Sequence, residues 1–331
     1  MLRIRTFVAI ATIAATLTAC GSSSKSTPKG GLDAALALAP QDATSVLFTQ
    51  WSAFGNVDDP KNPAMAGELA SYDVLIQSDL GFKSTQATWE ADVLGSGAPM
   101  TVLKFDGKFD FGAVETKLVS LGYEKATADG RDVLSRGSMP DSDDKMWEVP
   151  MGTVGIDRDR QLMVSTGGGV DSVQAFLAGG SSLLDRSDVK QLAGKIGTVT
   201  TAAVAVGNQA CEPLSAIGAR MSPAALQRVR QQFTALGSFS PFTADIIGVR
   251  TSGASLAALA FADSAAARAN AKARAAAPNV MATIMGVEPN RLTVDATTVS
   301  GSVLALELHL ADPRVLPEAV NNRALGFDVC L

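Results

Sequence analysis

A strand–strand–helix arrangement occurs twice along the chain, and this repetition constrains the fold more than any other feature. Residues 91–106 and 244–263 both begin with an apolar strand whose second residue is aspartate, followed by a glycine turn and a second apolar strand. Each second strand leads through a phenylalanine and an aspartate into a helical pattern. Further strand pairs follow at residues 154–164 and 292–310, each with a helix after it. The sequence therefore predicts an internal duplication.

The duplication predicts an α+β fold. Hairpins joined by helices are typical of antiparallel sheets, so we expect each half to supply about four strands and at least two helices, with the helices packed on one face. A chain of 331 residues is long enough for two domains or for one duplicated domain. We place the first half at residues 32–195 and the second at residues 196–331.

Capping residues mark the helices that follow the repeated hairpins. Asp110 precedes apolar residues at helical spacing and a glycine follows them, which predicts a capped helix. In the second copy we expect Asp263 or Ser264 as the cap, and a helix over residues 265–277 that ends at Pro278.

Two other helices fit the duplicated plan. One is expected at residues 63–77 in the first half and the other at residues 222–236 in the second. The second of these has Ser222 as its cap, Pro223 in its first turn and Gly237 as its stop, which is the usual placement of these residue types.

The first twenty-one residues have the pattern of an export signal. Arg3 and Arg5 precede an apolar run at residues 7–17, which is shorter than the roughly 20 residues that a membrane-spanning helix needs. The run leads into Leu-Thr-Ala-Cys, which ends at Cys20 and resembles the lipobox of bacterial lipoprotein signal peptides. Thr18 stands where a smaller residue is usual. The resemblance implies cleavage of residues 1–19 and a diacylglycerol on the sulfur of Cys20.

The same resemblance implies a location on the extracytoplasmic face of the cell membrane. Acyl chains such as palmitate would hold the protein there, because each buried CH₂ group contributes about 0.8 kcal/mol. Residues 20–31 would be a lipidated tether, since residues 21–31 contain nothing apolar to bury. The abundance of alanine and the excess of arginine over lysine resemble an actinobacterial protein, and the whole chain resembles uncharacterised exported lipoproteins of that group.

Cys211 and Cys330 remain once Cys20 carries lipid. An exported protein meets an oxidising compartment, and a bond at Cys330 would hold an otherwise fraying tail, so we expect a disulfide between these two residues. The alternative is two buried free thiols. In the chain-entropy model such a loop, of more than about 100 residues, stabilises the fold by about 4–5 kcal/mol. A zinc site is not expected, because His309 is the only histidine and the two cysteines are isolated in the sequence.

Charge and aromatic content disfavour nucleic acids and sugars as partners. The formal net charge is −5, and it falls to about −7 once Arg3 and Arg5 are removed with the signal peptide. No basic cluster remains to neutralise a phosphate backbone, so we expect no nucleic acid partner. Aromatic residues make up 5% of the chain and the three tryptophans are far apart in the sequence, which disfavours sugar clefts and base-stacking platforms.

Four segments could carry chemistry, and each has a simpler interpretation. Residues 164–171 resemble a glycine-rich phosphate loop but lack its spacing, so we expect a tight turn before a helix. Residues 140–145 contain three acidic residues without the glycine and glutamate of a calcium loop, which indicates a solvated loop. His309 alternates with leucines, which predicts an exposed position on a strand. Asp58 and Asp59 lie in a segment typical of a loop.

We therefore predict no catalytic residue, cofactor or metal site, since the chain has one histidine and no Gly-x-Ser-x-Gly motif. The expected function is that of a non-catalytic, membrane-anchored accessory or scaffold subunit for another component of the cell envelope. The alternative is a carrier of a lipid or other small apolar ligand in a cavity between sheet and helices. A hydrolase of envelope polymers comes third, because it would depend on carboxylate pairs that a sequence does not place in space. The expected partners are the membrane, through the N-terminal lipid, and an envelope protein or lipid.

Overall fold

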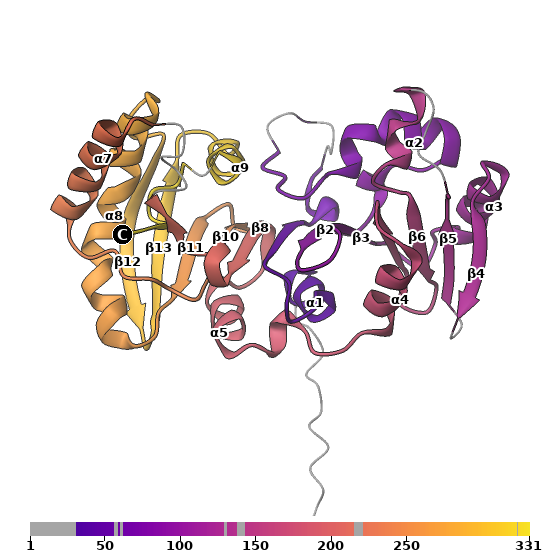
Figure 1. Ribbon diagram of the computed structural model, residues 1–331, viewed down its shortest axis with the longest axis horizontal. Coiled ribbons are helices and arrows are strands. Elements are labelled where there is room, and N and C mark those ends of the chain that lie inside the picture. Colours follow the sequence, from indigo (N-terminus) through magenta and orange to yellow (C-terminus); the bar gives the residue numbers. More distant parts are fainter. Residues whose placement is uncertain are drawn as a thin grey trace, which may run out of the picture.

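One sheet runs through the whole molecule (Figure 1). The structure is a computed structural model and describes residues 31–55, 59, 62–128, 131–137, 143–214, 221–322 and 324–331. Within these ranges the sheet has 12 strands. They are β1 (Ser45–Thr49), β2 (Trp89–Leu94), β3 (Met100–Lys104), β4 (Glu124–Ala128), β5 (Arg131–Ser135), β6 (Thr153–Asp157), β7 (Leu162–Thr166), β8 (Val199–Val206), β10 (Ala244–Arg250), β11 (Ser255–Ala260), β12 (Leu292–Ser300) and β13 (Val303–Leu310).

The two halves of the sheet repeat one strand order. Across the sheet the order is β12-β13-β11-β10-β8-β1-β2-β3-β7-β6-β5-β4, and every neighbouring pair is antiparallel. Read outward from the centre, β1-β2-β3-β7-β6 in one half corresponds to β8-β10-β11-β13-β12 in the other. This arrangement agrees with the predicted duplication, and the first half alone adds the hairpin of β4 and β5.

The repeat extends to single positions in the register. Asp92 on β2 lies opposite Leu47 and Thr101. In the second half Asp245 on β10 lies opposite Ala205 and Leu259 in the same way. The aspartate that both sequence copies share therefore occupies the same place in the two halves.

β1 and β8 join the halves at the centre of the sheet. They pair antiparallel over their length, with Val46 opposite Val204 and Phe48 opposite Ala202. All four side chains are buried. Because this pairing continues the ladder without a break, the two halves form one sheet.

Helices cover both faces of the sheet. The eight α-helices within the described residues are α1 (Gly31–Leu38), α2 (Asp73–Leu80), α3 (Phe111–Ser120), α4 (Val170–Ala178), α5 (Ser187–Ile196), α7 (Pro223–Leu236), α8 (Ser264–Met285) and α9 (Val315–Asn321). In Figure 1, α1, α4 and α5 line the lower side of the sheet, α2 and α9 lie on the upper side, and α7 and α8 lie at the left end.

The side chains on β11 show why one layer of helices is not enough. Leu256 and Ala258 join the core beneath the sheet together with α1, α4 and α5. Ala257 and Leu259 join a second core together with α8 and α9. The predicted α+β class with an antiparallel sheet is confirmed. The helices differ from the expected single layer because these strands are apolar on both faces and therefore need cover on both.

The second repeat begins earlier than the expected boundary at residue 196. Helix α5 packs on β10 and β11, which belong to the second half. It precedes the central strand β8 as α1 precedes the central strand β1. By its packing and its place in the order, α5 is the first element of the second repeat.

Two of the four helices expected from their caps and patterns begin and end as predicted. The side chain of Asp110 accepts a hydrogen bond from the N–H of Ala113 at the start of α3. Ser222 does the same for Ala225 at the start of α7. The helix expected at residues 63–77 begins later, with a 3₁₀ turn at Leu69–Tyr72, and α2 continues past the expected end to Leu80.

Helix α8 differs most from its expected bounds. Asp263 caps it, as one of the two candidates, by accepting a hydrogen bond from the N–H of Ala266. The helix does not end at Pro278 but continues to Met285, and Gly286 follows it in the left-handed conformation. Pro278 costs the helix one backbone hydrogen bond. The buried side chains of Ala277 and Met281 on either side of it keep the helix packed beyond that point.

No helix in the described ranges combines the length and the apolar character needed to cross a membrane.

Candidate functional site

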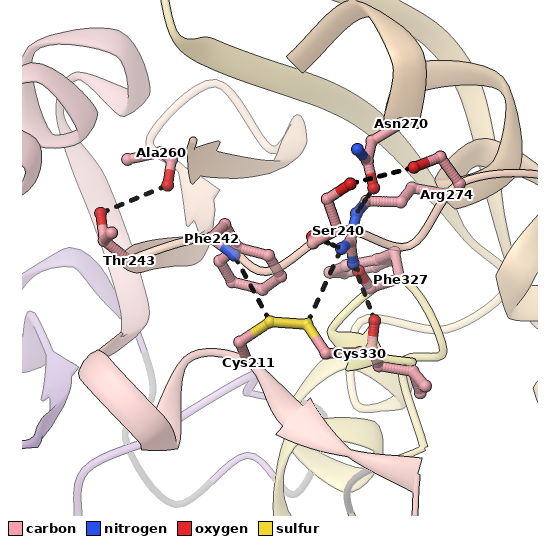
Figure 2. The surroundings of a disulfide bond; sticks show 11 residues. Cys211, Ser240, Phe242, Thr243, Ala260, Asn270, Arg274, Phe327 and Cys330 are labelled. Atoms are coloured by element: carbon pink, nitrogen blue, oxygen red, sulfur yellow. Dashed lines mark hydrogen bonds between the residues drawn. A yellow bond between two sulfur atoms is a disulfide. The ribbon is translucent and has the colours of Figure 1, made fainter. Parts of the chain in front are cut away.

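The structure joins Cys211 and Cys330 in a disulfide, as the sequence led us to expect (Figure 2). Their Cα atoms are 5.6 Å apart, and 119 positions separate them in the sequence. The bond lies at a short parallel strand pair formed by β9 (Glu212–Pro213) and β14 (Val329–Cys330). It fastens the last strand of the chain to the segment that follows β8.

A buried arginine lies beside this disulfide. Arg274, on α8, is fully buried, and its guanidinium reaches the backbone of two other segments. Nη2 donates to the carbonyl oxygen of Ser240 at 2.7 Å, and Nη1 donates to the carbonyl oxygens of Phe327 and of Val329, the latter at 3.0 Å. Nε donates to Oδ1 of Asn270, one turn earlier on the same helix, at 3.2 Å. Arg274 therefore connects α8 to the C-terminal segment and to the segment around Ser240 that precedes β10.

Aromatic rings surround the same guanidinium. The central carbon of the guanidinium, Cζ of Arg274, lies 4.8 Å from the ring centre of Phe242, 5.3 Å from that of Phe239 and 5.4 Å from that of Phe261. Burial lowers the pKa of Arg274 to about 10, against the opposing attraction of Asp328 and Asp245. The side chain therefore stays cationic at neutral pH, and the ring faces stabilise its charge.

The equivalent aspartates of the two halves meet different surroundings. Asp245 is buried, and burial raises its pKa well above the ordinary range; Asp328 adds to this effect while Arg274 opposes it. In the first half Oδ1 of Asp92 accepts from the Thr101 hydroxyl at 2.8 Å, and Oδ2 accepts from the N–H of Gly67 at 3.1 Å. Burial nevertheless raises the pKa of Asp92.

Glu90 lies two positions before Asp92 on the same face of β2. Its side chain is fully buried, and Oε2 accepts a hydrogen bond from the indole N–H of Trp51 at 2.8 Å. Burial raises the pKa of Glu90 well above the ordinary range, and the charge of Asp92 raises it further. Glu68 nearby also has a raised pKa, first through burial and then through Asp92. The three carboxyl groups thus favour their neutral forms more than exposed ones would.

A pocket of about 460 Å³ lies above Asp92. Leu47, Asp92 and Leu94 from the sheet line it, and the segment at residues 64–68 forms its wall. The hydroxyl of Thr49 holds this wall in place, because it accepts from the N–H groups of Met65 and Ala66 at 3.0 and 2.9 Å. Both oxygens of the Asp92 carboxylate already accept hydrogen bonds, Oδ1 from Thr101 and Oδ2 from Gly67 in this wall.

A second pocket, of about 300 Å³, lies on the opposite side of the sheet. It is bounded by the end of α1, the connection between β2 and β3, and α4. Small and apolar residues make most of its lining, including Leu38, Val93, Ala98, Met100 and Phe176. A pocket of this size and lining suits a small apolar group more than a charged one.

The glycine-rich segment forms the tight turn that the sequence predicted. Strand β7 ends at Thr166 and α4 begins at Val170. The N–H of Gly168 donates to the Thr166 hydroxyl at 3.0 Å, and the Thr153 hydroxyl donates to the carbonyl oxygen of Gly168 at 2.7 Å. These contacts use the N–H and the carbonyl oxygen of Gly168 within the protein.

His309 is exposed on β13, opposite Thr293, as predicted. Cys20, Asp58 and residues 140–142 lie outside the described residues. The acidic segment continues into a 3₁₀ helix at Asp143–Glu148. Among the residues that the structure describes, no group of three or more His, Cys, Asp or Glu side chains is arranged to hold a metal ion.

Sequence reasoning singled out the two cysteines. It missed the buried charged groups: Arg274 beside the disulfide, and Glu90 and Asp92 on β2 in the other half. A signal was present in each case. Asn270 and Arg274 stand four residues apart on the small-residue face of α8, and two carboxylates interrupt the otherwise apolar strand β2. What the sequence does not show is which distant carbonyls and rings surround these groups.

No protein-family model, curated protein or solved structure matches the chain.

Proposed function

We propose that this protein is a non-catalytic lipoprotein of the cell envelope, held at the membrane through Cys20 and acting as an accessory or scaffold subunit for another envelope component. The observation that carries the proposal is the lipobox-like sequence at residues 17–20 followed by a polar stretch at residues 21–31. The first described helix, α1, begins at Gly31, where this stretch ends. A tether of this length leaves the folded body free to turn above a membrane surface.

An anchored protein of this kind could act without catalytic activity of its own. Confinement to the membrane plane raises the effective concentration of the protein near a resident partner without any new contact. The duplicated body then offers two related surfaces on one continuous sheet. This combination suits a subunit that holds other components in place.

Replacement of one residue tests the anchor. In the Cys20→Ser variant we expect an unprocessed chain that lacks the diacylglycerol mass found on the wild-type protein. Globomycin, which blocks processing of lipoprotein precursors, should give the same precursor from the wild-type chain. Cys330→Ser is the matched control, because it removes a cysteine without touching the signal. Unchanged processing and membrane retention in Cys20→Ser would refute the anchor.

Cross-linking in intact cells tests the accessory role separately. A lysine-reactive cross-linker should recover the same envelope protein in replicate experiments with the wild-type chain, and recovery should fall in the Cys20→Ser variant. If the wild type is anchored yet yields no reproducible partner, the scaffold role is wrong even though the location is right.

A second function is favoured by the apolar pocket between α1 and α4. In this case the protein would carry a small apolar ligand, such as part of a lipid. Native mass spectrometry of protein purified from its own envelope should then show an added mass that is lost on Ala175→Trp, which places an indole at the pocket wall. Ala269→Trp, at an exposed position on α8, is the control. A clean mass without ligand in the wild type would exclude the carrier function.

A further inference from the structure

The two sulfurs of the disulfide have unequal surroundings. Cys330 is 8% exposed and lies in the core around α8, whereas Cys211 is half-buried. Of the two residues, Cys211 is therefore the more accessible to an external thiol. The sulfur that such an attack would release is the enclosed one, Cys330.

Each sulfur also has its own N–H donor. The backbone N–H of Phe242 donates to Sγ of Cys211 at 3.4 Å, and Nη2 of Arg274 donates to Sγ of Cys330 at 3.8 Å (Figure 2). A neutral disulfide gains little from a neighbouring guanidinium, but a thiolate gains considerably, because a cation beside a thiol favours its ionised form. The contact therefore stabilises the reduced state of Cys330 more than the oxidised state.

The guanidinium does not depend on the disulfide for its position. Asn270, the carbonyl oxygen of Ser240 and the surrounding phenylalanine rings hold it from α8 and from the segment before β10. Its bonds to the carbonyl oxygens of Phe327 and Val329 hold the C-terminal segment as well. Since these contacts do not involve sulfur, they remain available after the sulfur–sulfur bond is broken.

Two carboxyl groups share the field of the guanidinium. Asp245 and Asp328 both interact electrostatically with Arg274. Burial favours the neutral form of Asp245, so this carboxyl group opposes a thiolate at Cys330 less than a charged one would. The charge of Asp328, two residues from Cys330, acts against a thiolate at that position, and Arg274 must outweigh it.

We infer that the Cys211–Cys330 bond is a thiol–disulfide exchange site, at which an external thiol attacks Cys211 and Cys330 leaves as a thiolate held by Arg274. In the first step the attacking thiolate bonds to the sulfur of Cys211, the bond between the two cysteines breaks, and its electron pair stays on Cys330. In the second step the other thiol of the same dithiol reductant, as its thiolate, attacks the reductant sulfur that is bonded to Cys211. Cys211 then leaves as a thiolate. The dithiol is oxidised to a disulfide and the protein is reduced by two electrons.

The direction of attack can be tested with glutathione as the probe. The full chain, purified in detergent, is exposed briefly to reduced glutathione, quenched with iodoacetamide and mapped by peptide mass spectrometry, which also separates Cys20 from the other cysteines. We expect glutathione on Cys211 and the alkyl group on Cys330. The reverse pattern, or a disulfide that resists reduction until the protein unfolds, would overturn the inference.

The role of Arg274 can be tested in two opposite directions. In the Cys211→Ser background, Cys330 should be alkylated with an apparent pKa below the ordinary thiol value of about 8.5. Arg274→Gln should raise that pKa and slow reduction of the intact disulfide about tenfold, whereas Asp328→Asn should lower the pKa and speed reduction. The Asp328→Asn arm keeps the test decisive if Arg274→Gln fails to fold.

Arg250→Gln is the matched control. Arg250 also donates to two backbone carbonyls, those of Ile196 at 2.7 Å and Lys195 at 2.9 Å, and none of its described bonds involves sulfur. It should lose stability without changing the Cys330 titration. If Asp328→Asn leaves reduction at the wild-type rate, or if Cys330 titrates at or above 8.5 with Arg274 present, Arg274 does not assist the leaving sulfur and the proposal is wrong.

Discussion

At the scale of single residues, the two halves handle a buried carboxyl group differently. Asp245 in the second half interacts with a cation from α8, whereas Asp92 in the first half is held by the Thr101 hydroxyl and the N–H of Gly67. Glu90 beside it accepts hydrogen bonds from the Trp51 indole and from the backbone of Leu69, yet burial still raises its pKa. Such a group destabilises the fold when it ionises, because the charged form loses its water on burial.

Glu90→Gln should therefore stabilise the protein at neutral pH. The folded state raises the pKa of Glu90 above its ordinary value of 4.5, so the folded protein holds this proton more tightly than the unfolded chain. Stability due to this group is then complete below about pH 4.5 and falls as the pH rises toward the folded pKa, by about 1.4 kcal/mol for each unit of the shift. The Gln variant avoids this loss.

Melting temperatures of the wild type and Glu90→Gln at pH 4 and pH 8 measure the effect. We expect the variant to be more stable at pH 8 and close to the wild type at pH 4. Glu307→Gln is the control, because Glu307 is exposed on β13. A gain of equal size at both pH values would mean that Glu90 acts through its shape and not through its charge.

At the scale of elements, equivalent helices of the two repeats begin with the same device. Asp110 caps α3 and Asp263 caps α8, each by accepting from the N–H three residues further along. Both helices follow the second strand of a repeated hairpin. The cap thus fixes where the chain turns from sheet to helix in each copy.

Asp110→Ala and Asp263→Ala should each cost about 1 kcal/mol of unfolding free energy, the usual value for loss of such a cap. Asp→Asn at the same two positions should cost less, because asparagine also accepts the hydrogen bond. Urea unfolding followed by circular dichroism gives the comparison. Equal losses for the alanine and asparagine variants would show that the charge at the helix start matters more than the hydrogen bond.

Local signals predicted the elements well because they depend on neighbours in sequence. The repeated hairpins and the caps at Asp110 and Ser222 could be recognised in this way. The end of α8 could not, because contacts from elsewhere decide it. Gly326 has a positive φ, and a side chain there would come within 2.7 Å of the carbonyl oxygen of Ala277, so the C-terminal segment packs directly on the helix beside Pro278.

At the scale of the whole molecule, the surroundings of the disulfide could not be predicted from the sequence, because they too depend on contacts between distant segments. Arg274 bonds to carbonyl groups 53 and 55 residues away, and no local pattern encodes that distance. The union of the halves is also a long-range feature, because β1 and β8 come together across 153 residues at the contact between Phe48 and Thr201. The sequence pattern predicted apolar strands but not that both of their faces would be covered.

The continuous sheet predicts that the protein unfolds as one cooperative unit. The three tryptophans, Trp51, Trp89 and Trp147, all lie in the first half, so their fluorescence reports on that half alone. Leu306→Ala removes a fully buried side chain from β13 in the second half, at a cost of about 2–5 kcal/mol. If β1 and β8 couple the halves, this distant change must lower the tryptophan unfolding midpoint in urea.

Leu134→Ala on β5, also fully buried, is the reciprocal variant. It should lower the midpoint at which peptides of α8 lose protection from hydrogen exchange, although α8 lies in the other half. Both variants should keep a single transition with an unchanged dependence on urea, as a two-state unit requires. If Leu306→Ala leaves the tryptophan midpoint where it was, the halves unfold independently, and the central strand pair joins two domains rather than one folding unit.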